Sequence, residues 1–450
     1  MTTPVGTRVP ARAWAVLAIL STAQFLVVLS TSIVNIALPA VRDGIGLSGT
    51  ALSWVVNAYV LAFGALLLPG GRIADLAGRR RIFLTGVGVF TAAVVAAGLA
   101  PNAAVLISAR AVQGLAAALI APAALALTLG AFPPGRGRGV ALGVWGAVSG
   151  AGGAAGVLLG GVLTQWWGWR SIFLASAPLA IVVLVGALLM VAADRPKPGR
   201  RLDVIGTITL TAGLLSLTYS LTTLRTGGGT VLPLIAGLLL LGAFVARQRT
   251  ATDPLVPPRV LGIRTVAGAN ASMLVLGAIW IGLFYFLPLY QQQVLHYSPL
   301  AAGVSQLPLA LMVMTGSAGA PWLAARLGHR TPLIGGLLLL AAGLFWLART
   351  PQHAAALPDV IAPTLLIGAG LGTAFVGLTT LSTAGVPAAE TGVASGLINA
   401  TRQVGGALGL ALLIAVSGPA SGYGHAFVTA GVLSVIAAGL GALVQRPPAR

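Results

Sequence analysis

Long apolar stretches separated by short basic segments run through the whole chain. A helix that spans a membrane needs about 20 mostly apolar residues. Only 7% of the 450 residues are charged and 57% are hydrophobic, whereas a soluble domain carries about 25% charged residues. The chain cannot cover a water-facing surface of this size, so it predicts an all-α membrane protein with 14 transmembrane helices. Their expected ranges are 14–39, 51–70, 82–100, 104–132, 139–164, 171–192, 204–224, 231–247, 265–291, 300–325, 332–349, 358–385, 391–416 and 425–445.

The basic residues are distributed unevenly between the two ends of these helices. If the amino terminus is cytoplasmic, 20 of the 26 Lys and Arg residues lie in cytoplasmic loops or tails. Cytoplasmic loops of membrane proteins carry such an excess. The pattern predicts a multi-pass protein of the cytoplasmic membrane with both termini inside, and it explains the net charge of +19 without a nucleic acid partner. The exceptions are four residues in outside loops and two within helices, namely Arg42, Arg170, Arg225 and Arg349, and Arg110 and Arg402.

The segment Gly71–Phe83 (GRIADLAGRRRIF) places four arginines and one aspartate between two apolar runs. We expect a tight loop here, in which Asp75 ends the second helix and Arg79 begins the third. The segment Ala325–Arg330 repeats the spacing of Asp75–Arg80 after the tenth helix. This echo predicts two six-helix repeats plus two inserted central helices, as in transporters that rock around a central site. The expected parts are a cytoplasmic tail (1–13), a six-helix bundle (14–192), two inserted helices with cytoplasmic loops (193–264), a second six-helix bundle (265–445) and a tail (446–450).

The chemistry that the chain lacks is also informative. It has no cysteine, which excludes disulfides and thiolate metal sites. Its single lysine, Lys197, lies between two prolines, so no phosphate-binding Walker loop is present. The short loops leave no room for a soluble catalytic domain. We therefore expect no cofactor, no metal site and no enzyme activity.

Five segments carry a resemblance to a known family. They are Gly71–Arg81 between the second and third helices, Leu106, Arg110, Gln113 and Gly114 in the fourth, Gly152, Gly156, Gly160 and Gly161 in the fifth, Ser32–Pro39 in the first, and Gly396–Gly405 in the thirteenth. In these segments the chain resembles the major facilitator superfamily, specifically its fourteen-helix drug:proton antiporter branch of the multidrug efflux type. The resemblance implies a monomeric secondary transporter that exports small organic compounds by alternating access, linked to protons.

Three positions depart from the family pattern. The family usually has aspartate where this chain has Ser30 and Gly-Pro where it has Gly156–Val157, and the second-half loop has Ala325 where the first half has Asp75. All seven Asp and Glu residues are expected in loops or at helix ends, and the histidines in loops, whereas a proton antiporter commonly uses a buried carboxylate. Three possibilities follow. An acid at a helix end such as Asp43 couples, the substrate carries the charge, or the protein is an uncoupled facilitator or importer of an acidic metabolite.

The resemblance assigns a gating role to Gly71, Asp75, Gly78, Arg79 and Arg80. A carboxylate beside guanidinium groups forms charge-assisted hydrogen bonds, and glycine permits a sharp reversal of the chain. The alternative is that the arginines only set the topology.

Arg110 is a candidate for proton coupling or substrate binding, because an arginine inside a membrane helix costs roughly 2.5–3.5 kcal/mol and needs a partner. Gln113 lies one turn further along the same face. The alternative is that backbone carbonyls hold Arg110 as a packing element. Two intramembrane cations, Arg110 and Arg402, also suit an anionic substrate. The further candidates of this group are Ser30, Asn35, Asn399 and Gln403.

The fifth-helix glycines, Gly152, Gly156, Gly160 and Gly161, are expected to let that helix lie tightly against a neighbour. Polar and aromatic residues at helical spacing are candidates for lining a cavity for a bulky, mostly apolar ligand. Their alternative roles are anchoring at the membrane interface and hydrogen bonding between helices. The cavity candidates are Gln24, Asn57, Tyr59, Trp145, Trp280, Tyr285 and Gln306.

Overall fold

The computed structural model describes residues 10–132, 135–192, 194, 201–224, 231–349, 356–387, 390–417 and 422–444. Within these ranges all regular secondary structure is helical, and 14 helices are long and apolar enough to cross a membrane. The first six spans are α1 (Ala11–Ile45), α2 (Gly49–Ala77), α3 (Arg79–Gly98), α4 (Ala103–Ala131), α5 (Arg136–Trp167), and α6 (Ser171–Leu174) with α7 (Ser176–Met190). The inserted pair is α8 (Val204–Thr223) and α9 (Val231–Thr250). The last six are α11 (Arg264–Gln293), α12 (Pro299–Ser305) with α13 (Leu307–Leu327), α14 (Arg330–Leu347), α15 (Ala362–Thr383), α16 (Thr391–Val416) and α17 (Tyr423–Val444), with the short α10 (Pro258–Leu261) and η2 (Ala356–Ile361) before α11 and α15.

Side-chain caps set where several helices begin. The Ser48 and Ser298 hydroxyls accept from backbone N–H groups in the first turns of α2 and α12, and Asn102 does the same for α4. These acceptors satisfy amides that have no partner within the helix. Pro39 and Pro69 lie inside α1 and α2 without ending them, as membrane helices often allow. Both helices therefore continue beyond the predicted ends at residues 39 and 70.

The expected loop Gly71–Phe83 is instead almost entirely helical. α2 continues to Ala77 and α3 begins at Arg79, so Gly78 alone separates them. Gly78 has φ 97°, and Gly328, which ends α13, has φ 74°. Both lie in the left-handed region, which glycine adopts without a Cβ clash. The predicted repeat is thus visible as the same glycine turn in both halves. A second difference concerns His425, expected in a loop, which lies in the first turn of α17, while His353 lies outside the described residues.

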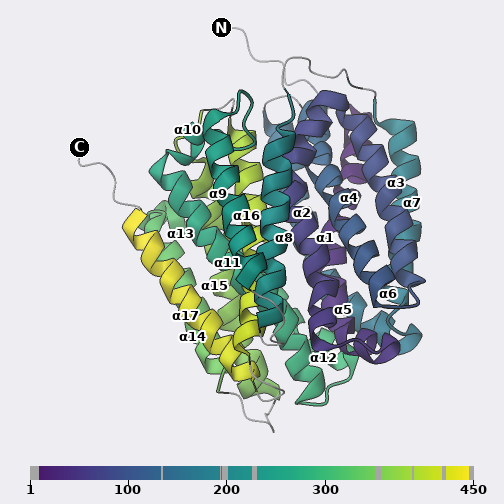
Figure 1. Ribbon diagram of the computed structural model, residues 1–450, viewed down its shortest axis with the longest axis vertical. Coiled ribbons are helices and arrows are strands. Elements are labelled where there is room, and N and C mark those ends of the chain that lie inside the picture. The colour runs from purple at the N-terminus through teal and green to yellow at the C-terminus, as the bar shows by residue number, and fades with distance from the viewer. Residues whose placement is uncertain are drawn as a thin grey trace.

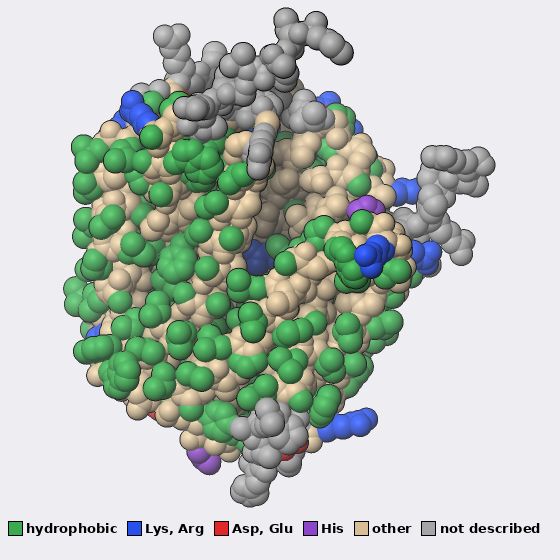
Figure 2. Space-filling model, turned by 180° about the vertical axis from the view of Figure 1, so that it is seen from behind, with side chains coloured by type: hydrophobic (Ala, Val, Ile, Leu, Met, Phe, Trp, Pro, Cys, Tyr) green, Lys and Arg blue, Asp and Glu red, His purple; other side chains and the backbone are tan. Residues whose placement is uncertain are grey.

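The two six-helix halves stand side by side, and α8 lies over the seam between them (Figure 1). There it contacts α2 of the first half and α16 of the second. We call the end of the bundle where α1 begins and α17 ends the terminal face, and the opposite end the far face. Figure 2 shows the surface hollowed between the halves toward the terminal face, with a basic side chain inside the hollow.

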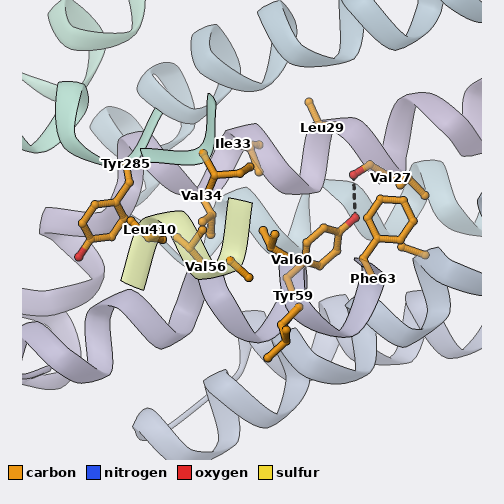
Figure 3. Close-up of a cluster of buried hydrophobic side chains, with 14 of the residues drawn as sticks. Val27, Leu29, Ile33, Val34, Val56, Tyr59, Val60, Phe63, Tyr285 and Leu410 are labelled. Carbon is orange, nitrogen blue, oxygen red and sulfur yellow. Dashed lines mark hydrogen bonds between the residues drawn. The ribbon is translucent and has the colours of Figure 1, made fainter. Parts of the chain in front are cut away.

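Apolar packing joins the halves away from this hollow. Val34 and Val56 of the first half share one buried cluster with Tyr285 and Leu410 of the second (Figure 3). Apolar side chains also cover the outside, for example Leu232 at 76% exposed and Leu189 at 75%. An exposed apolar surface of this extent suits a lipid solvent.

Candidate transport site

Arg110 on α4 is held inside the first half by three contacts. Its Nε donates to the Val55 carbonyl at 2.9 Å and its Nη1 to Gln113 Oε1 at 2.7 Å. Its guanidinium carbon lies 4.4 Å from the centre of the Tyr59 ring, and the Tyr59 hydroxyl donates to the Val27 carbonyl (Figure 3). Arg110 is only 1% exposed. It is therefore a buried cation whose position is fixed by neighbouring backbone and side chains.

Several polar atoms in this region have no hydrogen-bond partner within the described structure. They include Arg110 Nη2, Gln113 Nε2 and both side-chain polar atoms of Asn57. The expected proximity of Arg110 and Gln113 is observed. The bond to Val55 fits the packing role and the unpaired atoms fit a binding or coupling role, so both roles stay predictions.

Arg402 on α16 has a different environment. It is half-buried, and within the described structure no hydrogen bond or ion pair reaches its guanidinium. Its guanidinium carbon lies 5.9 Å from the Trp280 ring centre on α11 and 5.7 Å from the Phe375 ring centre on α15. The Trp280 ring lies 5.7 Å from that of Phe375 and 6.1 Å from that of Phe284. Arg402 therefore lies beside a cluster of half-buried aromatic rings.

The other candidates do not gather at one point. Asn35 and Asn399 donate to carbonyls of their own helices, those of Thr31 and Ser395. A Cβ on Gly64 of α2 would lie 2.7 Å from that of Gln403, which places Gln403 where the halves touch. The remaining four candidates are spread over three helices: Ser30 is buried on α1, Gln24 is half-buried there, Trp145 is half-buried on α5, and Tyr285 is buried on α11.

The halves meet at the far face through backbone and amide groups. Gln292 Nε2 on α11 donates to the Ile36 carbonyl on α1 at 2.8 Å. A Cβ on Gly161 of α5 would lie 2.6 Å from the Pro299 carbonyl oxygen at the start of α12. Gln306 Nε2 donates to Gln291 Oε1 at 2.9 Å just behind this contact. The far face is therefore closed, and Gln306 supports the closure.

Toward the terminal face the halves separate. Cβ atoms on Gly139, Gly143 and Gly146 of α5 would have no atom of a neighbouring element within 4 Å. On Gly150 the nearest would be Met314 Cγ of α13 at 3.9 Å. The hollow of Figure 2 thus opens at the terminal face and ends at the closed far face.

The predicted gate residues lie at the terminal face, within the first half. Asp75 Oδ1 accepts from Arg79 Nε at 3.0 Å and Nη2 at 2.8 Å. The Asp194 carboxylate accepts from the backbone N–H groups of Arg79 at 2.8 Å and Arg80 at 3.0 Å. An anion at a helix N-terminus is stabilised by the free amides and the helix dipole. Asp194 therefore fixes the start of α3, whereas a Cβ on Gly71 would make only an ordinary van der Waals contact with Pro122 of α4, at 3.4 Å.

Three of the four predicted packing glycines of α5 lie against α1, whereas Gly161 lies against α12 of the other half. Cβ atoms on Gly152 and Gly160 would lie 3.0 Å from the Phe25 carbonyl oxygen and 2.6 Å from that of Ile33. On Gly156 the Cβ would overlap Ser32 Oγ. Close approach of two membrane helices at small residues is a common packing mode.

All seven acids fall within the described residues, and none lies in the middle of a spanning helix. Asp203 caps α8, and its side chain is 2% exposed. Burial raises the pKa of the Asp203 carboxyl, but hydrogen bonds from the Gly206 N–H, Arg247 and Gln248 outweigh burial, so its pKa lies below the ordinary value. The others are Asp43 beside Arg42, Asp75, Asp194, Asp253 beside Arg201, Asp359 at the start of the twelfth span, and Glu390 beside Arg259. Metal-binding groups of three or more such side chains are absent from the described part of the chain.

Comparison with known proteins decides the family. A model of the Major Facilitator Superfamily matches residues 20–410. The chain belongs to this superfamily. The cephamycin export protein CmcT of Amycolatopsis lactamdurans is 42% identical over 448 residues, which cover 95% of this chain and 92% of that protein. The puromycin resistance protein pur8 of Streptomyces alboniger is 44% identical over 419 residues, covering 91% and 82%.

Solved structures agree on the fold. The POT family transporter PepTSo matches with a TM-score of 0.73 at 15% identity, covering 97% of this chain and 98% of that one. The D-xylose-proton symporter matches with a TM-score of 0.70 at 14% identity, covering 95% and 97%. The predicted drug efflux type of the superfamily is confirmed: this member is a multi-pass membrane transporter that exports small organic compounds.

Trp280 was among the predicted cavity residues, but four side chains of this superfamily member were missed as partners: Phe284, Phe375, Asp194 and Gln292. Phe284 lies one turn after Trp280, so helical spacing was a usable signal for it. Phe375 gave no such signal, because it reaches Arg402 from another helix. Asp194 lies 115 residues from Arg79, and Gln292 lies 256 residues from Ile36. Neither pairing leaves a pattern in a single sequence.

Proposed function

We propose that this transporter exports antibiotic-like organic compounds across the cytoplasmic membrane by alternating access, as a monomer with both termini in the cytoplasm. The hollow between the halves is the observation that carries this proposal, because it opens at the terminal face and is closed at the far face. With cytoplasmic termini the structure corresponds to a state that loads substrate from inside the cell. The names of the cephamycin and puromycin relatives support this substrate class.

The predicted roles of individual residues fit this cycle. Asp75, Gly78, Arg79 and Arg80 lie at the face that must close after loading, and Gly161 lies at the face that must open. The far-face contacts have to break for release, while the packing of α5 on α1 stays within one half. We therefore assign gating to the ends of the two halves and rigidity to the helix interiors.

Proton linkage is the expected energy source, and an uncoupled movement of an acidic compound is the second candidate. One observation favours the second: the seven acids lie at helix ends or in loops, whereas Arg402 is a half-buried cation without an acidic partner in the described structure. A desolvated carboxylate is the common proton carrier in such proteins.

Transport in liposomes tests the proposal. Purified protein is reconstituted, and uptake of puromycin and of a cephamycin is measured into inside-out oriented vesicles with and without an imposed pH gradient. We expect uptake above that of protein-free vesicles. Acceleration by the pH gradient supports proton linkage, and an unchanged rate supports the second candidate. If the protein moves neither these compounds nor a wider panel of antibiotics, the proposed function is wrong.

A further inference from the structure

Two intramembrane arginines of this chain differ in how far their charge is satisfied. Arg110 makes two hydrogen bonds, lies over Tyr59 and is 1% exposed. Arg402 is half-buried, has no hydrogen bond or ion pair in the described structure, and its Nε is buried without a partner. A charged group at this depth is costly unless it is paired. Arg110 keeps one unpaired donor, Nη2, but the Arg402 guanidinium makes no hydrogen bond at all in the described structure, so its charge is the less satisfied of the two.

The backbone around Arg402 is rigid. A Cβ on Gly277 of α11 would overlap the Arg402 carbonyl, so α11 and α16 are in direct backbone contact there. One residue earlier, the Thr401 hydroxyl donates to Asn270 Oδ1 on α11 at 2.9 Å. A guanidinium on a fixed backbone is pre-organised, which reduces the entropy lost when a ligand binds.

Aromatic rings form the surroundings of this guanidinium. Trp280 and Phe375 lie within 6 Å of it, and the Phe284 ring lies beside that of Trp280. At this distance the rings compensate the charge only in part, since a cation–π contact contributes about 0.5–2 kcal/mol. All three rings are half-buried, as Arg402 is. They leave the hydrogen-bonding groups of Arg402 unoccupied and offer an apolar surface next to them.

Acidic side chains of the protein do not reach this site. All seven acids lie at helix ends or in loops, and six of them have named partners there. Arginine is suited to planar, bidentate recognition of a carboxylate, and such charge-assisted bonds are stronger away from water.

We propose that Arg402 binds the carboxylate of an organic acid whose apolar body packs against Trp280, Phe284 and Phe375. This inference rests on the proposed export function and names the substrate class that the site prefers. The carboxylate forms two parallel N–H···O bonds with the guanidinium. The aromatic rings select an organic anion over a small inorganic one.

Binding of an acid and its ester tests the assignment directly. The probes are cefoxitin, a β-lactam with one carboxylate, and its methyl ester, measured by titration on full-length protein in nanodiscs. We expect the wild type to bind the acid at least about tenfold more tightly than the ester, the range expected for a charge-assisted bond. Arg402→Gln should abolish this preference and leave the affinity for the ester unchanged. Arg402→Lys should keep part of it, because the charge remains without the planar fork.

Arg326 provides a matched control. Its guanidinium lies 4.1 Å from the centre of the exposed Trp322 ring near the terminal end of α13, so Arg326→Gln removes the same chemistry outside the site. This variant should bind both probes like the wild type. If Arg402→Gln does not fold, the acid-to-ester ratio of the wild type and of Arg402→Lys still decides.

Three results overturn the inference. The wild type binds acid and ester equally, Arg402→Gln weakens both alike, or chloride and phosphate compete as well as cefoxitin does. The third result indicates a site for inorganic anions. If the wild type still exports puromycin in these cases, the proposed function stands. If the wild type transports none of the tested compounds, the proposed function itself is wrong.

Discussion

The contact of Gly161 with Pro299 gives a sharp test of alternating access. Gly161→Ala adds a Cβ that would lie 2.6 Å from the Pro299 carbonyl oxygen and 3.2 Å from Leu300 Cα. Both atoms belong to backbone at the start of α12, so they cannot turn away as a flexible side chain does. Overpacking of this kind costs about 1–3 kcal/mol. The contact joins the two halves only when the far face is closed, so the cost falls on that state alone.

A cost of about 1–3 kcal/mol changes the ratio of far-face-closed to far-face-open protein by about 5- to 150-fold. Gly153→Ala on the same helix is the matched control, because its Cβ would have no atom of a neighbouring element within 4 Å. The two variants share the same change in helix propensity. Only Gly161→Ala should shift the equilibrium toward an open far face and slow export.

Double electron–electron resonance between two spin labels can measure this shift toward an open far face. The chain contains no cysteine, so spin labels attach only at introduced sites. Asp43→Cys and Arg349→Cys place labels at exposed far-face positions of the two halves. We expect longer label-to-label distances in Gly161→Ala than in the wild type or Gly153→Ala. Identical distance distributions in all three proteins, with equal export rates, would refute the reasoning.

Three further changes probe other contacts. Gln292→Ala removes the hydrogen bond to the Ile36 carbonyl of the other half. It should raise the far-face-open fraction about 2- to 10-fold in the same distance assay. Gln293→Ala, which loses only a hydrogen bond from Tyr423 of its own half, should match the wild type. Asp203→Asn should lower the melting temperature at pH 6. Because the pKa of Asp203 in the folded protein is depressed, the difference in melting temperature between wild type and variant should persist above about pH 4 and disappear as pH falls further. A difference that grows in acid would contradict this sign. Asp75→Asn should slow export about 2- to 5-fold, because it removes the half-exposed ion pair with Arg79. An export rate equal to that of the wild type would argue against the gate.

The fold was predictable because each spanning helix can be recognised from its own stretch of sequence. A run of about 20 apolar residues has few alternatives to a membrane helix, and even α8 and α9 formed where expected. The ends were less predictable, since Pro39 and Pro69 read as stops in soluble proteins but continue a helix in lipid. The Gly71–Phe83 segment was expected to be a loop because it is rich in charged residues. In the structure those residues continue α2 and begin α3.

The site was predictable only where its contacts are local. Arg110 and Gln113 are three residues apart, so helix geometry alone brings them together. The state of Arg402 depends on Phe375 from another helix and on acids that are absent from its surroundings. Tertiary packing decides both, and a single sequence does not record it. The closure of the far face by Gln292 and Gly161 has the same origin.

The position of the seven acids at helix ends and in loops has an electrical consequence. A substrate anion paired with Arg402 meets no protein carboxylate inside the membrane, so its charge crosses with it. In a cell with an inside-negative membrane potential, 100 mV favours the outward passage of one negative charge by about 2.3 kcal/mol. This free energy sustains about a 50-fold excess of the anion outside. For an organic anion, the voltage across the membrane would itself drive export by a protein of this build.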